Sequence, residues 1–157
     1  MGRVDYYQDE NAPQANSLVP GASAIVTDDQ GRVLLHKRAD NENWALPSGT
    51  MDFGERLHET AVRETREETG VEVEVEGLVG IYSDPEHVFA YDDGEVRQEF
   101  NICFARRVVG GELGDTDDEA LDVGWFTREE VEALTMHPSI RLRIHHHFEE
   151  RDRPYLG

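Results

Sequence analysis

The chain has 157 residues, a length typical of one domain, and a chain of this size buries roughly 70% of the surface that its unfolded form exposes. Its 34 acidic and 15 basic side chains give a formal net charge of −19. This charge argues against nucleic-acid or acidic-membrane partners, because both attract basic surfaces. The sequence contains no apolar signal segment and no run near the ~20 apolar residues of a membrane span, so we expect a cytoplasmic protein.

Residues 1–17 are polar and show no periodicity, which predicts a flexible arm before one domain over residues 18–157. Two aromatic residues in the arm, Tyr6 and Tyr7, are candidates to dock on the body of the domain or on a second subunit. A homodimer is therefore an open alternative to a monomer.

The first part of the domain is predicted to be a hairpin followed by an extended segment. Residues 19–27 and 33–37 are rich in β-forming side chains, and residues 28–31, Asp-Asp-Gln-Gly, are typical of a hairpin turn between them. After a polar loop, residues 44–47 are short and extended. They deliver the chain into a glycine-rich loop over residues 48–54, where backbone can approach a ligand closely.

A helix is predicted over residues 57–69, with Leu57, Ala61 and Val62 on its apolar face. Gly70 suits the left-handed conformation that commonly ends a helix. The strict alternation of valine and glutamate that follows, residues 71–76, is typical of a half-buried strand, and residues 78–82 are expected to continue it.

The last part of the chain is predicted to contain two strands and two helices. Thr127 and Glu130 have the spacing of a capping box at the start of the first of these helices. The order of elements fits an α+β fold, an α/β/α sandwich with a mixed sheet between helices. The expected elements are strands over residues 95–109 and 123–126 and helices over residues 127–134 and 138–149.

The predicted helix over residues 57–69 carries three carboxylates on one face. Glu64, Glu67 and Glu68 lie three or four residues apart, so they point to the same side. Their mutual repulsion weakens the helix unless a hard cation binds, and Mg²⁺ and Mn²⁺ prefer such oxygen ligands. The alternative from composition alone is a solvated acidic face with Arg63 and Arg66 in surface ion pairs.

The loop and helix together resemble the signature of the Nudix hydrolases, a family that includes MutT-like and ADP-ribose pyrophosphatase-like members. Two positions depart from the pattern: Thr65 stands where an aliphatic residue is usual, and Ser48 where many members have a second glycine. The matching positions are Gly49, Glu55, Arg63, Glu64, Glu67, Glu68, Gly70 and Val71.

This resemblance implies a Mg²⁺-dependent pyrophosphohydrolase with the Nudix α/β/α fold, with Mn²⁺ as an alternative ion. It implies that Glu64, Glu67, Glu68 and the Gly49 carbonyl are the metal ligands. It also implies that Arg63 orients the carboxylates for catalysis.

A general base is needed beyond these ligands, unless a helix glutamate serves. Glu119 is the first candidate, because it lies six residues before Trp125, at the offset that mutator-type members use. Glu99 and Glu86 are the second and third candidates. For each of the three, a surface role is the alternative.

Substrate recognition is expected from side chains outside the signature. Arg38 and Arg97 are candidates to hold the far phosphate or ribose, with a surface charge as the alternative, whereas Tyr82 and Phe89 are candidates to stack on a base, with a place in the core as the alternative. Trp44 and Tyr91 are further aromatic candidates.

The substrate itself is less defined. Pro85 lies fourteen residues after Val71, near the position of a proline that the family associates with ADP-ribose hydrolysis, although Asp-Pro also favours a simple turn. The short chain is nearer in size to the family's nucleoside-triphosphate hydrolases. We expect ADP-ribose or a nucleotide sugar first and a (d)NTP next.

Two other classes of function compete with the enzyme. One is a non-catalytic Nudix-like domain that senses a nucleotide, and the other is an acidic metal-binding or interaction protein. Retention of all three motif glutamates favours the enzyme. The single cysteine, Cys103, lies in an apolar run typical of a buried structural thiol, and the three consecutive histidines, residues 145–147, point in different directions around a helix and cannot share one ion.

Overall fold

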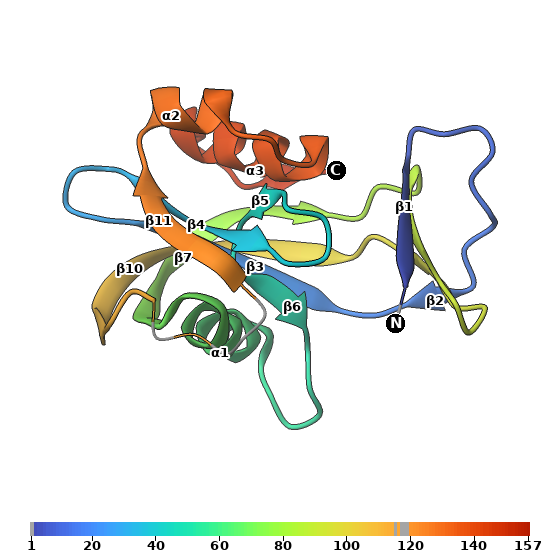
Figure 1. The fold of residues 1–157 in the computed structure, drawn as a ribbon, viewed down its shortest axis with the longest axis horizontal. Coiled ribbons are helices and arrows are strands. Elements are labelled where there is room, and N and C mark those ends of the chain that lie inside the picture. Colours follow the sequence, from blue (N-terminus) through green and yellow to red (C-terminus); the bar gives the residue numbers. More distant parts are fainter. Residues whose placement is uncertain (1, 115, 117–119) are drawn as a thin grey trace.

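A mixed sheet forms the middle layer of the fold (Figure 1). The computed structural model describes residues 2–114, 116 and 120–157. The strand order is β11-β4-β3-β10-β7-β12, with β5 paired to β4 and β6 paired to β3. The strands of this sheet are β3 (Gly21–Thr27), β4 (Val33–Arg38), β5 (Trp44–Ala45), β6 (Ser48–Thr50), β7 (Val71–Tyr82), β10 (Asn101–Gly111), β11 (Ala120–Phe126) and β12 (Tyr155–Leu156).

Helices cover both faces of this sheet, which confirms the predicted α/β/α sandwich. One face carries α1 (Leu57–Thr69), and the opposite face carries α2 (Arg128–Ala133) and α3 (Pro138–Phe148) (Figure 1). Alternate residues of β3 serve the two layers, because successive side chains of a strand point to opposite faces. Ala22, Ala24 and Val26 pack with Ala61 of α1, whereas Ile25 packs in the cluster that contains Val131 and Ile144.

A second, smaller sheet stands at one end of the molecule, in the order β1-β8-β9-β2 (Figure 1). Its first strand lies inside the segment that the sequence assigned to a flexible arm. Residues 3–7 pair antiparallel with residues 87–91, because the edge of β8 offers unpaired backbone groups. This pairing partner lies far away in the sequence, so the pattern of residues 3–7 alone does not predict a strand. The strands are β1 (Arg3–Tyr7), β2 (Ser17–Leu18), β8 (His87–Tyr91) and β9 (Val96–Gln98).

The expected single strand over residues 95–109 is two strands. The chain leaves the small sheet after Gln98 and enters the large sheet at Asn101. At the break, the Glu99 amide donates to the His87 carbonyl at 2.9 Å, and the Gly21 amide donates to the Phe100 carbonyl at 2.9 Å. These two bonds join the small sheet to the large one next to β6.

The signature helix has the predicted bounds. It spans Leu57–Thr69 and ends at Gly70, whose φ of 83° is the left-handed conformation expected of a terminating glycine. The capping box of Thr127 and Glu130 is also confirmed. Cys103 is buried. Within the part of the chain that the structure describes, no helix is long and apolar enough to cross a membrane.

Candidate active site

The carboxylate face of α1 lies against β6, so that Glu64 meets the backbone of Gly49. A Cβ atom added to Gly49 would lie 2.8 Å from Glu64 Cγ and closer still to the carboxyl carbon. Any side chain at this position would therefore displace the Glu64 side chain. Residues 48–50 pair with residues 21–23 of β3, which fixes the glycine loop to the centre of the large sheet.

Arg63 links the signature carboxylates to one another. Its Nε and Nη2 donate to the two oxygens of Glu55 at 2.7 and 3.0 Å, and its Nη1 donates to Glu64 at 2.8 Å and to Glu67 at 3.3 Å. Nη2 also donates to the Thr50 carbonyl at 3.1 Å. One guanidinium therefore holds the helix and the loop in a fixed relation, as a rigid fork of donors can.

Glu68 is held by two groups that the sequence did not point to. Its carboxylate accepts the Ser48 amide at 3.0 Å and lies 2.7 Å from His36 Nε2. His36 comes from β4 and is buried, two residues after Leu34 on the face that α1 covers. The signal available in the sequence was a lone histidine inside an apolar strand, which is too weak to single out.

Electrostatics separate the roles of the glutamates. Burial, together with the nearby Glu68 carboxylate, raises the pKa of Glu64 well above the usual range of glutamate. Hydrogen bonds from Arg63 lower the pKa of Glu55 to about 2. Glu55 is thus a permanent anion that neutralises Arg63, whereas Glu64 lies where negative charge accumulates without full compensation. A cation at Glu64 and Glu68 would remove that repulsion.

Thr65 departs from the family pattern but leaves no buried polar atom unsatisfied. Its side chain is fully buried, and its hydroxyl donates to the Ala61 carbonyl at 2.6 Å, one turn earlier.

A cavity of about 590 Å³ opens beside the glycine loop. Ser48, Gly49 and Thr50 are among its lining residues, and β1, β8 and β9 of the small sheet contribute others. A volume of this size is in the range of ligand sites. The described residues of α1 do not line the cavity, and the link between the two is Gly49, which lines the cavity and contacts Glu64.

Three of the four expected substrate-binding residues line this cavity: Arg38, Phe89 and Arg97. Trp44 and Tyr91 line it as well. Both arginines are already paired, because Arg38 donates to Asp40 at 2.6 and 2.9 Å and Arg97 donates to Glu95 at 2.6 and 3.1 Å. The guanidinium of Arg97 also lies over the Tyr91 ring, 4.7 Å from its centroid.

Tyr82 lies elsewhere. It is 4% exposed within the core, and its hydroxyl is 2.8 Å from His146 Nδ1. It is not among the described residues that line the cavity. Tyr82 is therefore a core residue, which was the alternative to a role in stacking on a base.

The three candidate bases have different surroundings. Glu99 lines the cavity but is buried and paired with Arg143. Glu86 lies with Pro85 on a separate hollow near residues 8–15. Glu119 lies outside the described residues.

Several residues that line the cavity were not expected from the sequence. β1 supplies Arg3 and Asp5, and the start of α3 supplies His137. These residues reach the cavity only through the pairing of β1 with β8 and the packing of α3, which are non-local contacts. No periodicity within the N-terminal segment indicates them.

The fold and this site define an α/β/α protein in which a carboxylate-bearing helix packs against a glycine loop that lines a cavity. The NUDIX domain family model matches residues 17–148. The chain therefore belongs to the NUDIX family, hydrolases that act on phosphoric anhydride bonds, and the family indicated by the signature is confirmed.

Named relatives agree with this family. A MutT-like protein of Streptomyces ambofaciens is 32% identical over 79% of this chain and 72% of its own length. An ADP-ribose pyrophosphatase of Methanocaldococcus jannaschii is 38% identical, and the match covers 59% of this chain and 53% of that protein. The fold is shared with a NUDIX hydrolase from Nitrosomonas europaea, with a TM-score of 0.71, 22% identity and coverage of 88% and 93% of the two chains.

Proposed function

We propose that this protein is a Mg²⁺-dependent pyrophosphohydrolase that cleaves the diphosphate linkage of a nucleoside diphosphate derivative. The observation that carries the proposal is the contact between Glu64 and Gly49 at the edge of the 590 Å³ cavity. A diphosphate placed at that edge would lie against the carboxylate face of α1, with the rest of its molecule in the cavity.

The residues present fit a hard divalent ion. Glu64, Glu67, Glu68 and the Gly49 carbonyl would hold it, because carboxylate and carbonyl oxygens are the ligands that Mg²⁺ and Mn²⁺ prefer. Burial and, after it, the nearby Glu68 carboxylate raise the pKa of Glu64, so a cation beside it would stabilise its charged form. When bound, the ion would supply positive charge that neutralises the diphosphate and makes the attacking water more acidic.

Each side chain then has a separate task. Arg63 positions Glu64 and Glu67 through its hydrogen bonds, with Glu55 as its counter-ion. His36 and the Ser48 amide orient Glu68. Glu119 is proposed to take the proton of the attacking water, and replacing it by glutamine should then slow turnover by roughly 10²–10⁴-fold.

The cavity favours a substrate with a bulky group on each side of the diphosphate. Phe89 and Tyr91 offer aromatic faces for a base, while Arg38 and Arg97 offer positive charge for a far phosphate or ribose. ADP-ribose or a nucleotide sugar is therefore proposed first and a (d)NTP next. The name of the Methanocaldococcus relative supports the first choice.

A substrate panel tests the proposal. The full chain is incubated with Mg²⁺ and, separately, ADP-ribose, nucleotide sugars, dinucleoside polyphosphates and (d)NTPs, and the products are separated by chromatography. ADP-ribose should give AMP and ribose 5-phosphate, whereas a (d)NTP should give a mononucleotide and pyrophosphate. Binding without turnover on every compound would instead support the sensor alternative.

Glu67→Gln is the matched test of the metal site, and Glu72→Gln is its control. Both residues are exposed glutamates, but Glu67 contacts Arg63 whereas Glu72 lies in β7 and pairs with Arg66. Loss of turnover is expected only for Glu67→Gln. Equal turnover in the two variants would refute the ligand assignment.

Two further expectations remain proposals: a cytoplasmic location and contact with a second subunit. Tyr7 gives no support for contact with a second subunit, because it packs within the chain, edge-on against His87 and His137. Size-exclusion chromatography with light scattering distinguishes a dimer from a monomer.

A further inference from the structure

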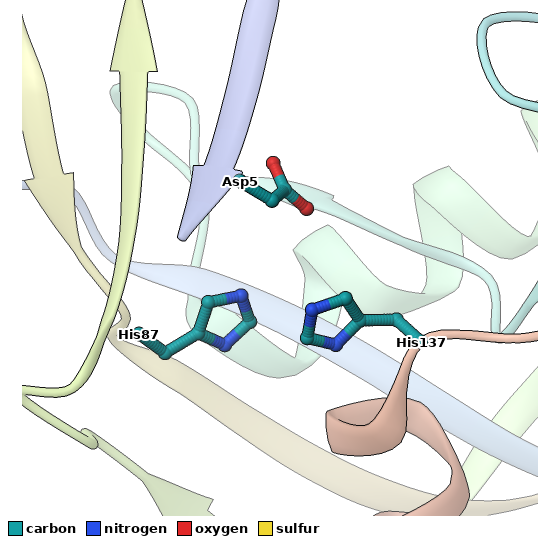
Figure 2. A group of neighbouring side chains, drawn as sticks. All are labelled: Asp5, His87 and His137. Carbon is teal, nitrogen blue, oxygen red and sulfur yellow. The ribbon is translucent and has the colours of Figure 1, made fainter. Parts of the chain in front are cut away.

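Three side chains with metal-ligating atoms meet in the cavity, away from the carboxylate face of α1. Asp5 comes from β1, His87 begins β8, and His137 is the residue before α3 (Figure 2). One ligand atom of each lies within 4.8 Å of the others. The pairing of Tyr7 with His87 and of Asp5 with Phe89 puts Asp5 and His87 on the same face of the small sheet.

His87 has the surroundings of a metal ligand that lacks its ion. The side chain is 2% exposed, and neither ring nitrogen has a hydrogen-bond partner among the described residues. Unpartnered buried nitrogens are unfavourable. The nearest carboxylate to Nδ1 is Glu99, at 3.5 Å, and Glu99 is held by Arg143. A metal-binding histidine usually donates its second ring nitrogen to a carboxylate, and Glu99 is placed to accept it after a small approach.

His137 is oriented by the start of α3. Its Nδ1 accepts the Ser139 amide at 3.1 Å and lies 2.8 Å from Ser139 Oγ. The Nε2 atom is thus left for the cluster, and Figure 2 shows a nitrogen of each imidazole directed to the space beside the Asp5 carboxylate. The two rings are within 7° of parallel, with centroids 4.6 Å apart, and Tyr7 packs edge-on against both.

His137 must change its tautomer to bind the ion. Coordination through Nε2 requires the remaining proton on Nδ1, where Ser139 Oγ is placed to accept it. The Ser139 amide would then lose its acceptor, a local cost that the metal bond must exceed.

We propose that Asp5, His87 and His137 form a three-ligand site for a borderline-soft divalent metal ion of the Zn²⁺ class. Two imidazoles and one carboxylate match zinc, which takes nitrogen and oxygen ligands in a tetrahedron, and they do not match Mg²⁺, which prefers six oxygens. All three side chains line the cavity, from which a fourth ligand would come. The site is separate from the Mg²⁺ ligands of the proposed function and does not depend on that function.

The side chains must close on the ion. Ligand atoms around a tetrahedral Zn²⁺ lie ~3.3 Å apart, from bond lengths of about 2.0–2.1 Å, whereas the three atoms now lie within 4.8 Å of one another. The two imidazoles must also turn, because rings within 7° of parallel do not aim their nitrogen lone pairs at one point. Asp5 is the exposed member of the three, and His87 is buried. Asp5 also accepts from Arg3 at 2.8 and 3.1 Å, so one of its oxygens would be shared between the guanidinium and the metal.

Cobalt(II) provides a direct test, because it replaces zinc and absorbs visible light strongly when tetrahedral. The full chain, with excess Mg²⁺ to fill oxygen sites, is titrated with Co²⁺ and then with Zn²⁺. One equivalent of Co²⁺ should give the tetrahedral spectrum, and Zn²⁺ should abolish it. Absence of the spectrum together with no Zn²⁺ binding by calorimetry would overturn the proposal.

Variants locate the signal. His137→Gln and Asp5→Asn should weaken Zn²⁺ binding by more than the ~100-fold that loss of an outer-sphere contact can cause, with circular dichroism verifying the fold. His145→Gln is the control, since His145 lies on the same helix but pairs with Glu132 at the surface. Unchanged binding in His137→Gln would overturn the site.

Glu67→Gln separates this proposal from the hydrolase proposal. It should retain the cobalt spectrum while losing Mg²⁺-dependent turnover. A spectrum lost in Glu67→Gln and retained in His137→Gln would place the ion on α1 and refute the histidine site, whereas a protein without turnover that keeps the spectrum would refute only the hydrolase.

Discussion

Gly49 lies so close to the Glu64 carboxylate that no side chain fits between them: an added Cβ would be 2.8 Å from Glu64 Cγ. Gly49→Ala must therefore push Glu64 out of position. A displacement of about 1 Å at a catalytic group can cost 10²-fold in rate. We expect turnover to fall by about 10²-fold and Mn²⁺ binding, measured by electron paramagnetic resonance, to weaken.

Gly77→Ala is the control for this substitution. Gly77 lies in β7, has no atom within 4 Å of an added Cβ, and does not need a left-handed conformation. Its variant should keep normal turnover and Mn²⁺ binding. If Gly49→Ala behaved like Gly77→Ala, the close approach to Glu64 would have no functional meaning.

We expect His36 to affect metal affinity by orienting Glu68, and not by contacting the substrate. Replacing it by leucine removes the donor 2.7 Å from the Glu68 carboxylate. Loss of such an orienting contact commonly lowers metal affinity or activity by 10–100-fold, and we expect the Mn²⁺ dissociation constant to rise by about that factor. His145→Gln should leave it unchanged, and an unaffected constant in His36→Leu would show that Glu68 needs no orientation.

The sequence predicted the elements whose signals are local. The helix over residues 57–69 has its period, its apolar face and its terminating glycine within one short stretch. The common face of the three glutamates follows from their spacing, because a helix fixes which residues share a face. The role of Arg63 was implied by the resemblance to the Nudix signature. Their partner His36 could not be predicted, because its relation to Glu68 depends on which strand packs beneath α1.

The cavity was harder to predict for the same reason. The sheet is covered on both faces, so the alternation of side chains along β7 does not predict which of them face a ligand. Tyr82 lies in the core, where its hydroxyl contacts His146. The strand at residues 3–7 forms only because β8 offers an edge about 80 residues later in the chain. From the sequence alone, residues 3–7 are therefore predicted to belong to a polar arm.

Acid should weaken the loop-helix junction through Glu55. Hydrogen bonds from Arg63 hold the pKa of Glu55 at about 2 in the folded protein, below the ordinary value of about 4.3. A lowered pKa stabilises the fold above the ordinary value, and this stabilisation is lost as pH falls towards 2. Glu55→Gln should therefore be less stable than the parent at pH 7 and nearly equal to it at pH 2.

Thermal melts in metal-free buffer between pH 7 and pH 2 measure this convergence. Glu72→Gln is the reference, because Glu72 is an exposed glutamate in a longer ion pair with Arg66, at 3.4 Å. Its melting temperature should follow that of the parent throughout. A difference between Glu55→Gln and the parent that stayed constant down to pH 2 would contradict the role given to Arg63.

Glu99 and Arg143 should support the cavity wall as a buried ion pair. Each side chain is 5% exposed, and they hydrogen-bond to each other. Arg143→Met leaves the Glu99 charge buried without its cation, which typically costs about 3–5 kcal/mol. The double variant Arg143→Met/Glu99→Gln removes both charges and should recover part of that loss in urea unfolding.

Arg151→Met is the control. It breaks an exposed pair with Glu149 and should cost less than about 1 kcal/mol. A double variant no more stable than Arg143→Met would show that packing, not the buried charge, dominates at this wall.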